Sequence, residues 1–371
     1  MMADWKECTI ADLGTVVGGA TPSTKDPENY NGGKIPWITP KDLSNFSDRY
    51  ISSGERSITE KGLNGCSTQL IPRHSVLFTS RAPIGYVAIS ENDVCTNQGF
   101  KSVVPNERTD FLFLYYLLKY NKDRIEGLGS GTTFKEISGS TMRGVTVRVP
   151  ESLEVQKAIG RYLDSIDTKI ETNRRINENL AQQAQAIYAD IFNTNADQAW
   201  PLGHLSDLII VRYGKDHKKL DDGPFPVYGS GGVMRYVEHP IYEKESVLIP
   251  RKGTLNNVMY VNKPFWSVDT MFFTEMKLPD VAKFVFHFVK SKDLASLNAG
   301  SAVPSMTTDI LNAMELYIPD AKTLKRFESI VGPMYETMQH NNEESKKLAA
   351  VRDALLPRLM SGELDVSDID L

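Results

Sequence analysis

A long helical pattern occurs twice in this chain, and this repeat constrains the fold more than any other feature. Over residues 152–192, apolar residues recur at alternating spacings of four and three, which is typical of a coiled-coil seam. The same phase returns over residues 322–360, 168 positions later, which is a whole number of heptads. The middle of the seam is polar in both copies, at Asn173 and Asn341. The apolar seam residues are Ile159, Leu163, Ile166, Ile170, Leu180, Ala184, Ile187 and Ile191 in the first copy, and Phe327, Val331, Met334, Met338, Leu348, Leu355 and Leu359 in the second.

Each pattern predicts a helix that is too long to stand alone. A helix of about 40 residues is about 60 Å long, because each residue adds about 1.5 Å. An isolated copy would leave its apolar seam in water, so we expect the two copies to pair with each other. Antiparallel pairing would create a pseudo-two-fold axis near Asn173 and Asn341. These two residues either fix the register of the pair or face water between two apolar blocks.

The segments outside the helices repeat as well. Trp5 and Trp200 open similar stretches, and the run SVL occurs at 75–77 and again at 246–248. Both segments read as short strands between Gly, Pro and Asn turns, with one apolar helix each. The predicted fold class is therefore α+β, with two similar α+β domains separated by two long helices that pair as an antiparallel coiled coil. The expected boundaries are a first domain at 1–150, a central helical spacer at 151–195, a second domain at 196–319 and a C-terminal helical spacer at 320–371.

Bulk properties exclude several classes of protein. The longest apolar run, residues 111–118, is too short to span a membrane, and no apolar signal core follows the N-terminus. The three cysteines lack the spacing of metal ligands and are expected to be small buried apolar residues of a cytosolic protein. The net charge is −5, so a DNA-binding surface would have to be a local basic face.

Familiar catalytic motifs are absent from the sequence. It contains no GxxxxGK[ST] nucleotide loop, no HExxH, and no Cys/His set with zinc spacing. The Asn-Pro-Pro-aromatic motif of DNA amino-methyltransferases is missing too. We therefore expect no catalytic residues, no metal site and no cofactor bound by this chain. An enzyme with an unfamiliar site, such as a stand-alone nuclease, is one alternative, although no carboxylate cluster near a lysine recurs in both copies.

Binding chemistry is easier to identify than catalysis. Cations occur at corresponding strand ends, because an ungapped comparison from the SVL runs places Arg81 opposite Lys252. Arginine and amide side chains can read base edges, whereas lysine and tyrosine mainly contact phosphates. Lys135 is included only for its place in the loop after Gly131. The candidate DNA-binding residues are Arg81, Asn97, Gln98 and Lys135 in the first domain, and Arg212, Lys215, Tyr228, Arg251, Lys252 and Asn256 in the second.

Several motifs resemble one known family over essentially the whole chain. The start of the first helix (150–156, PESLEVQ) and the end of the second (355–364, LLPRLMSGEL) resemble the helix boundaries of the specificity subunit of type I restriction–modification enzymes. The runs GGATP at 18–22 and GKIPWI at 33–38 are similar to the opening of that family's first target-recognition domain. The second copy lacks the GATP loop and the Glu and Gln of the helix start.

The resemblance implies a division of labour. The chain would be a non-catalytic subunit whose two domains each read half of a bipartite site in double-stranded DNA. Two methyltransferase subunits, and restriction subunits in the nuclease form, would carry adenine methylation, S-adenosylmethionine, ATP and Mg²⁺. The paired helices would set the spacing between the half-sites and dock the methyltransferase subunits.

The helix seam has two candidate uses, and the chain as a whole has a second candidate function. The seam residues Leu180, Ile187, Leu355 and Leu359 could serve partner docking, or they could be plain intramolecular core. The rival function is a coiled-coil scaffold whose two globular domains bind protein partners, which the nearly neutral domains permit.

Overall fold

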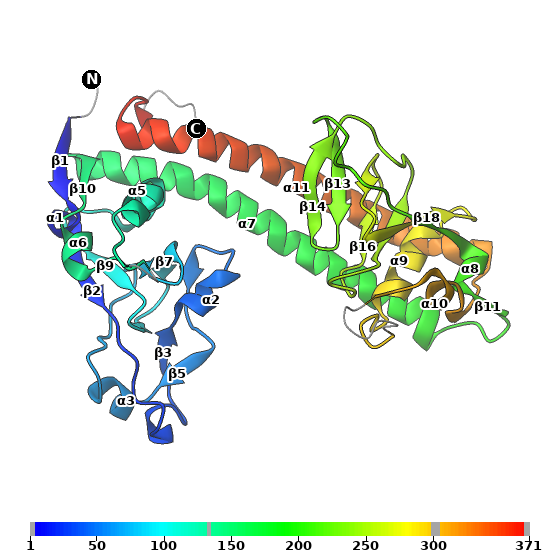
Figure 1. Ribbon diagram of the computed structural model, residues 1–371, viewed down its shortest axis with the longest axis horizontal. Helices are drawn as coiled ribbons and strands as arrows, with labels where there is room; N and C mark the ends of the chain where they lie inside the picture. Colours follow the sequence, from blue (N-terminus) through cyan, green and yellow to red (C-terminus); the bar gives the residue numbers. More distant parts are fainter. Residues whose placement is uncertain (1–3, 132–134, 298–304, 367–371) are drawn as a thin grey trace. The chain divides into compact units, whose positions relative to one another are not determined.

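Two compact units make up this computed structural model, which describes residues 4–131, 135–297 and 305–366 (Figure 1). Unit 1 takes its residues from 1–174 and 342–371, whereas unit 2 is the continuous stretch 175–341. Each unit contains one α+β globule and one part of each long helix. Because the division falls inside the long helices, it differs from the expected boundaries at 150, 195 and 319, which mark the ends of the globules.

Unit 1 contains three small sheets. The five-stranded sheet has the order β2 (Gly14–Gly18), β9 (Lys101–Pro105), β6 (Val76–Ser80), β7 (Ile84–Ser90) and β4 (Tyr50–Ile51). The three-stranded sheet is β5 (Arg56–Ile58), β3 (Ile35–Ile38) and β8 (Cys95–Thr96), and β1 (Trp5–Thr9) pairs with β10 (Thr146–Pro150). The helices are α1 (Ile10–Leu13), the 3₁₀ turn η1 (Pro27–Asn29), α2 (Pro40–Ser44), α3 (Glu60–Asn64), α4 (Phe111–Tyr120), α5 (Lys122–Gly127) and α6 (Gly139–Arg143).

Unit 2 repeats this topology with fewer strands. Its larger sheet has the order β12 (Ile209–Tyr213), β18 (Met271–Met276), β15 (Ser246–Pro250) and β16 (Met259–Val261). The smaller sheets are β14 (Gly232–Val237), β13 (Phe225–Gly229) and β17 (Trp266–Ser267), and β11 (Leu202–His204) with β19 (Glu315–Tyr317). The helices are α8 (Leu205–Leu208), α9 (Ala282–Lys290), α10 (Thr308–Asn312) and the π turn η2 (Asp190–Thr194).

The sheet order confirms that the globules are duplicates. In each larger sheet the first strand in the chain pairs with the last one, which gives the matching orders β2-β9-β6-β7 and β12-β18-β15-β16. Each three-stranded sheet also contains one parallel pair, β3 with β8 and β13 with β17. Sequence comparison predicted the duplication from a few shared residues. The predicted α+β class with two similar domains is therefore confirmed.

The long helices are α7 (Leu153–Ala189) and α11 (Ala321–Ser361), and they pair antiparallel as predicted. In unit 1, Arg352 contacts Asp167 at 2.5 Å, and Asn173 Nδ2 donates to Ser345 Oγ at 3.3 Å. Residue numbers therefore decrease along α11 where they increase along α7, which is antiparallel pairing. In unit 2, Asn341 Nδ2 donates to the Asn177 side-chain oxygen at 2.9 Å. Asn173 is only 1% exposed, and therefore the mid-seam asparagines bind across the helix pair instead of facing water.

The seam residues also contribute to the cores. Leu359 is fully buried in the same cluster as Ile159 and Leu163, and Leu355 packs partly buried against it. In unit 2, Ile187 is partly buried against the core, and Leu180 is half-buried. Burial of Leu359 fits the intramolecular interpretation, because a fully buried side chain has no surface to offer a partner.

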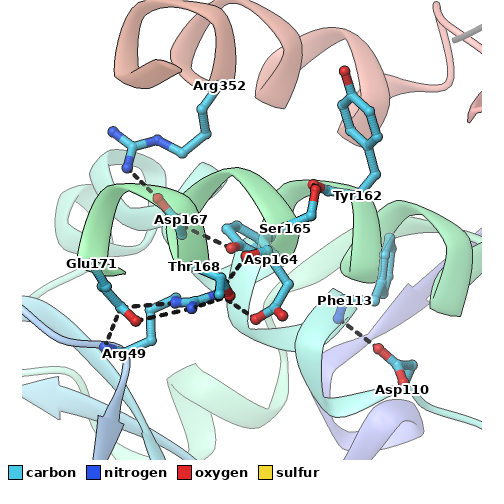
Figure 2. Close-up of polar contacts among 11 residues, drawn as sticks. Arg49, Asp110, Phe113, Tyr162, Asp164, Ser165, Asp167, Thr168, Glu171 and Arg352 are labelled. Atoms are coloured by element: carbon cyan, nitrogen blue, oxygen red, sulfur yellow. Dashed lines mark hydrogen bonds and ion pairs between the residues drawn. The ribbon is translucent and has the colours of Figure 1, made fainter. Parts of the chain in front are cut away.

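Arg49 anchors the first globule to α7 within unit 1 (Figure 2). Its guanidinium forms two parallel hydrogen bonds to Glu171, at 2.9 and 3.0 Å, and also donates to Thr168 and Asp164. The Arg49 side chain is 6% exposed and that of Glu171 is 14% exposed. Burial alone would lower the pKa of this guanidinium, but the contacts with Glu171 and Asp164 raise it, so it stays charged. Such two-pronged contacts fix orientation as well as distance.

A second buried polar contact ties the main helix of each globule to a long helix. In unit 1, the Tyr116 hydroxyl on α4 donates to Asp167 at 2.8 Å. In unit 2, His287 on α9 lies 2.9 Å from the Tyr335 hydroxyl and 2.8 Å from the Gln185 side-chain oxygen. Burial lowers the pKa of His287 to about 4, so this imidazole is neutral near pH 7. The two units therefore make equivalent attachments with different chemistry.

Candidate nucleic-acid interface

Three chain segments meet at one end of the larger sheet in unit 1. They are the loop after β2, the turn at 96–99 before β9, and the end of β6. Backbone hydrogen bonds join them, from Ala20 N to Thr96 O at 3.0 Å and from Ser80 N to Gly99 O at 2.7 Å. A third bond runs from Ile137 N to Ser80 O at 2.9 Å. These three segments and a fourth, at Ile137, are thereby gathered at one end of the sheet.

Unit 2 repeats the same three backbone bonds. Lys215 N donates to Ser267 O at 2.8 Å, and Arg251 N donates to Thr270 O at 2.9 Å. Met306 N donates to Arg251 O at 2.9 Å, which corresponds to the bond from Ile137. This correspondence places Arg81 and Lys252 at equivalent positions, one residue beyond the bonded carbonyl.

A glycine allows the close backbone approach in each unit. A Cβ on Gly19 would overlap the Thr96 carbonyl oxygen, and a Cβ on Gly214 would overlap that of Val268. The second copy lacks the sequence GATP, as expected, but Gly214 and Lys215 make the same backbone contacts with a different sequence. Gly214 corresponds to Gly19, where the close backbone contact leaves no room for a Cβ, and Lys215 corresponds to Ala20.

Tryptophan side chains hold both loops by the same bond. Trp37 Nε1 donates to Ala20 O at 3.0 Å, and Trp266 Nε1 donates to Lys215 O at 2.9 Å. Trp37 lies on β3, whereas Trp266 lies on β17, which corresponds to β8. The same anchor thus comes from neighbouring strands in the two units. Sequence comparison could not find this pair, because the two positions do not align.

The four candidates of the first domain lie together. Arg81 contacts Glu136 at 3.4 Å, and Lys135 is exposed beside it. The Asn97 side-chain oxygen accepts from Gly99 N at 2.8 Å, and Gln98 accepts from the Thr21 hydroxyl. Lys101, which the sequence analysis missed, also reaches Glu136, at 3.7 Å. The Glu136 carboxylate therefore contacts two cations, Arg81 and Lys101, and Lys135 precedes it in the chain.

The second domain gathers three of its six candidates at the equivalent place. The Arg251 guanidinium lies 5.3 Å from the centre of the Tyr213 ring and donates to Asp269 O at 3.2 Å. Lys215 and Lys252 are exposed, and their ammonium groups have no ion-pair partner among the residues that the structure describes. Tyr213, half exposed beside the loop, is a further member that the candidate set omitted.

The other three candidates are engaged within the fold. Arg212 forms a cross-strand ion pair with Glu275 at 2.9 Å. The Asn256 amide donates to Asp293 at 3.1 Å and accepts from Ala295 N at 3.0 Å. Tyr228 packs its ring against Phe265, and burial raises the pKa of its hydroxyl. These contacts give each side chain a structural role, whatever else it does.

A metal site and a membrane span are both absent from the residues that the structure describes. No group of three or more His, Cys, Asp or Glu residues in this part of the chain is arranged to hold a metal ion. Within the same residues, each helix is too short or too polar to serve as a membrane span.

Known proteins resemble this chain in sequence and in fold. The family described as Type I restriction modification DNA specificity domain matches residues 2–182 and 200–349. The specificity subunit of the type I restriction enzyme MjaIX from Methanocaldococcus jannaschii is 31% identical over 411 residues, covering 99% of this chain and 95% of that protein. The EcoprrI specificity subunit of Escherichia coli is 22% identical over 86% of each chain. The crystal structure of a type I restriction–modification S subunit from M. genitalium has the same fold, with a TM-score of 0.68, 20% identity and 96% coverage of each chain.

Proposed function

Because the chain belongs to the type I restriction–modification DNA specificity family, we propose that it is the DNA-reading subunit of a type I restriction–modification complex. Each unit reads one half of a bipartite site in double-stranded DNA. The observation that carries this proposal is the duplicated loop cluster. The same three backbone bonds and the same indole anchor present cations in both units.

The chemistry of the cluster suits DNA more than a protein partner. Arg81 and Arg251 can read base edges through their guanidinium groups, and Lys215 and Lys252 supply ammonium groups for phosphates. A scaffold that grips proteins would not need cations at equivalent positions of both units. The family match likewise favours DNA recognition over the scaffold.

The reactions of the complex belong, on this proposal, to other subunits. Two methyltransferase subunits would dock on the long helices and carry adenine methylation with S-adenosylmethionine. Restriction subunits would add ATP- and Mg²⁺-dependent translocation and cleavage in the nuclease form. The support is membership of a recognition-subunit family. The assembly would work in the cytoplasm, where it meets the chromosome.

Methylation mapping tests the function directly. Methylated adenines would be mapped across the host genome before and after deletion of this gene. We expect a motif with two defined halves and an undefined spacer to lose its methylation in the deletion strain and to regain it on complementation. A methylome that is unchanged by the deletion would refute the proposal.

Removing one cation from each cluster should weaken specific binding. We expect Arg81→Ala combined with Lys252→Ala to lower the affinity of the assembled complex for its target by about 100-fold, because each base or phosphate contact is worth about 1–3 kcal/mol. Titration of labelled duplex at several salt concentrations measures the affinity and the salt slope.

A matched control lies at the opposite ends of the same sheets. Arg108 follows β9 and Lys244 precedes β15, and both are exposed. Arg108→Ala combined with Lys244→Ala removes the same net charge and should leave the affinity within about 3-fold, because cations outside the interface act only through screened, long-range attraction. Equal losses for the two double variants would mean that net charge, and not the loop cluster, governs binding.

A further inference from the structure

The hairpin β13–β14 of unit 2 contains a β-bulge beside the loop cluster. Val227 faces Arg235 and Tyr228 faces Val233, so Met234 is the extra residue on β14. A bulge takes one side chain out of the regular alternation of a strand and gives it a new direction. Bulges of this kind are common next to functional sites.

Met234 is an exposed apolar side chain for which the hairpin makes room. At 62% exposed, it is the most exposed large hydrophobic residue in the described part of the chain, and its neighbour Val233 is 45% exposed. A Cβ on Gly229, across the hairpin, would lie 2.5 Å from the Met234 sulfur, so a larger residue there would displace the thioether. Isolated exposed hydrophobics are ordinary, but this one coincides with a bulge and a facing glycine.

The tip of the hairpin is fixed against the basic part of the cluster. Asn257 Nδ2 donates to Ser230 O at 2.7 Å, and a Cβ on Gly253 would lie 2.8 Å from Ser230 Oγ. Gly253 directly follows Lys252. On the other side, Val268 N donates to Tyr228 O at 3.1 Å, which joins β13 to the turn that Lys215 contacts.

Unit 1 has no counterpart of this side chain among its described residues. There the chain leaves the equivalent strand β3 through Thr39 and enters α2, so the short glycine-rich hairpin is replaced by residues 39–55. The strand that pairs with β3 begins at Arg56, which faces Trp37 as Arg235 faces Val227. The exposed Met234 side chain therefore gives unit 2 an apolar contact that the described residues of unit 1 do not offer at the equivalent place.

We propose that Met234 contacts a thymine methyl group in the half-site that unit 2 reads. The inference rests on the proposed function and adds a specificity-determining residue to it. Thymine offers the only methyl group in the major groove of unmodified DNA, and apolar side chains recognise it by contact. A long, polarisable thioether adapts to such a target. The flanking cations Lys215 and Lys252 match the phosphates of a duplex and disfavour an apolar protein surface as the occupant.

The test uses the assembled complex and the bipartite duplex found by methylation mapping. In two further duplexes, deoxyuridine replaces every thymine of one half-site, which deletes only the methyl groups. We expect the wild-type complex to bind one of these duplexes about 3- to 10-fold more weakly, since removing one buried methyl group changes affinity by roughly that factor. Met234→Ala should weaken binding to the unmodified duplex by a similar factor and should be insensitive to deoxyuridine in that half-site.

Two variants serve as controls. Met234→Leu keeps an apolar contact and should retain most of the sensitivity to the methyl group. Leu278→Ala truncates another exposed apolar residue, 41% exposed, just beyond the opposite end of β18 and should bind all duplexes as the wild type does. Because the deoxyuridine comparison with the wild-type complex needs no substitution, a folding defect in a variant cannot hide the result.

Two outcomes would overturn the proposal. These are a wild-type complex indifferent to deoxyuridine in both half-sites, and a Met234→Ala loss that is the same on all duplexes. The last result would instead indicate an apolar wedge between base steps. If the wild-type complex bound the mapped duplex and a scrambled duplex with equal affinity, the proposed function itself would be refuted.

Discussion

Replacing Arg49 by methionine is expected to destabilise unit 1 by about 3–5 kcal/mol, because removal of one member of a buried ion pair leaves the other charge without compensation. The variant would leave the carboxylates of Glu171 and Asp164 in a surface from which most water is excluded. For a unit of this size the loss corresponds to a fall in melting temperature of about 10 °C. Thermal unfolding followed by tryptophan fluorescence measures it, and hydrogen exchange along α7 locates it.

The pH dependence of this effect has a definite sign. Burial already raises the pKa of Asp164 in the wild-type protein, and the Arg49 charge opposes that rise. Without the guanidinium, ionised carboxylates are less favourable in the folded state than in the unfolded state. Folding then favours proton uptake, so the stability lost in the variant should shrink as pH falls from 7 towards 4.

A surface pair on the same unit provides the matched control. Arg358 contacts Glu363 at 3.0 Å, but both side chains are about half exposed or more. Arg358→Met should therefore cost less than about 1 kcal/mol. If the two methionine variants had the same melting temperature, the Arg49 cluster would have no special role in holding the globule on α7.

Shortening both long helices by one heptad is expected to change the DNA site that the complex methylates. The deletion would remove 174–180 from α7 and 338–344 from α11, which keeps the apolar seam in phase because one whole heptad is lost from each copy. Each helix then loses about 10 Å, equivalent to about three base pairs of duplex. We predict that methylation moves to a motif with the same two halves and a shorter spacer.

A one-sided deletion is the control for this experiment. Removing 174–180 alone leaves Asn341 and the neighbouring seam of α11 without their partners on α7, so the variant should be defective in folding or assembly. Methylation of the original spacer by the doubly shortened protein would show that the helices do not set the spacing. The readout in both cases is the methylome of cells that express the variant.

The helix pair was predictable from sequence because its signal is periodic. Residues such as Ile159 and Leu359 recur at spacings that only a coiled-coil seam explains, and the two copies keep their phase. Duplication of the globules followed from shared runs such as SVL at 75–77 and 246–248. The match of Arg81 with Lys252, which those runs give, is supported by the backbone bonds of Ser80 and Arg251. Such features can be recognised from the sequence alone because they depend on regular spacing along the chain.

The anchors were not predictable, since they depend on contacts between distant and irregular segments. Arg49 is a single arginine in a polar loop, and nothing nearby indicates that Glu171 lies 122 positions further along the chain. The indole anchors occupy strands that do not align, although they bind equivalent carbonyls. In the candidate site, residue type alone could not show which side chains are available to a ligand. Lys215 is exposed, whereas the Asn256 amide is hydrogen-bonded to Asp293 and Ala295.

The discontinuity of unit 1 has a consequence for the synthesis of this protein. Residues 175–341 form unit 2 as one continuous stretch, whereas unit 1 needs segments from both sides of it. At about 5–20 residues per second, the ribosome takes roughly 10–30 s to pass through that stretch. During this interval, Ile159 and Leu163 have emerged without Leu359, the residue that later covers them. The domain that emerges first is therefore completed last, and part of its apolar seam stays uncovered until the end of α11 has been synthesised.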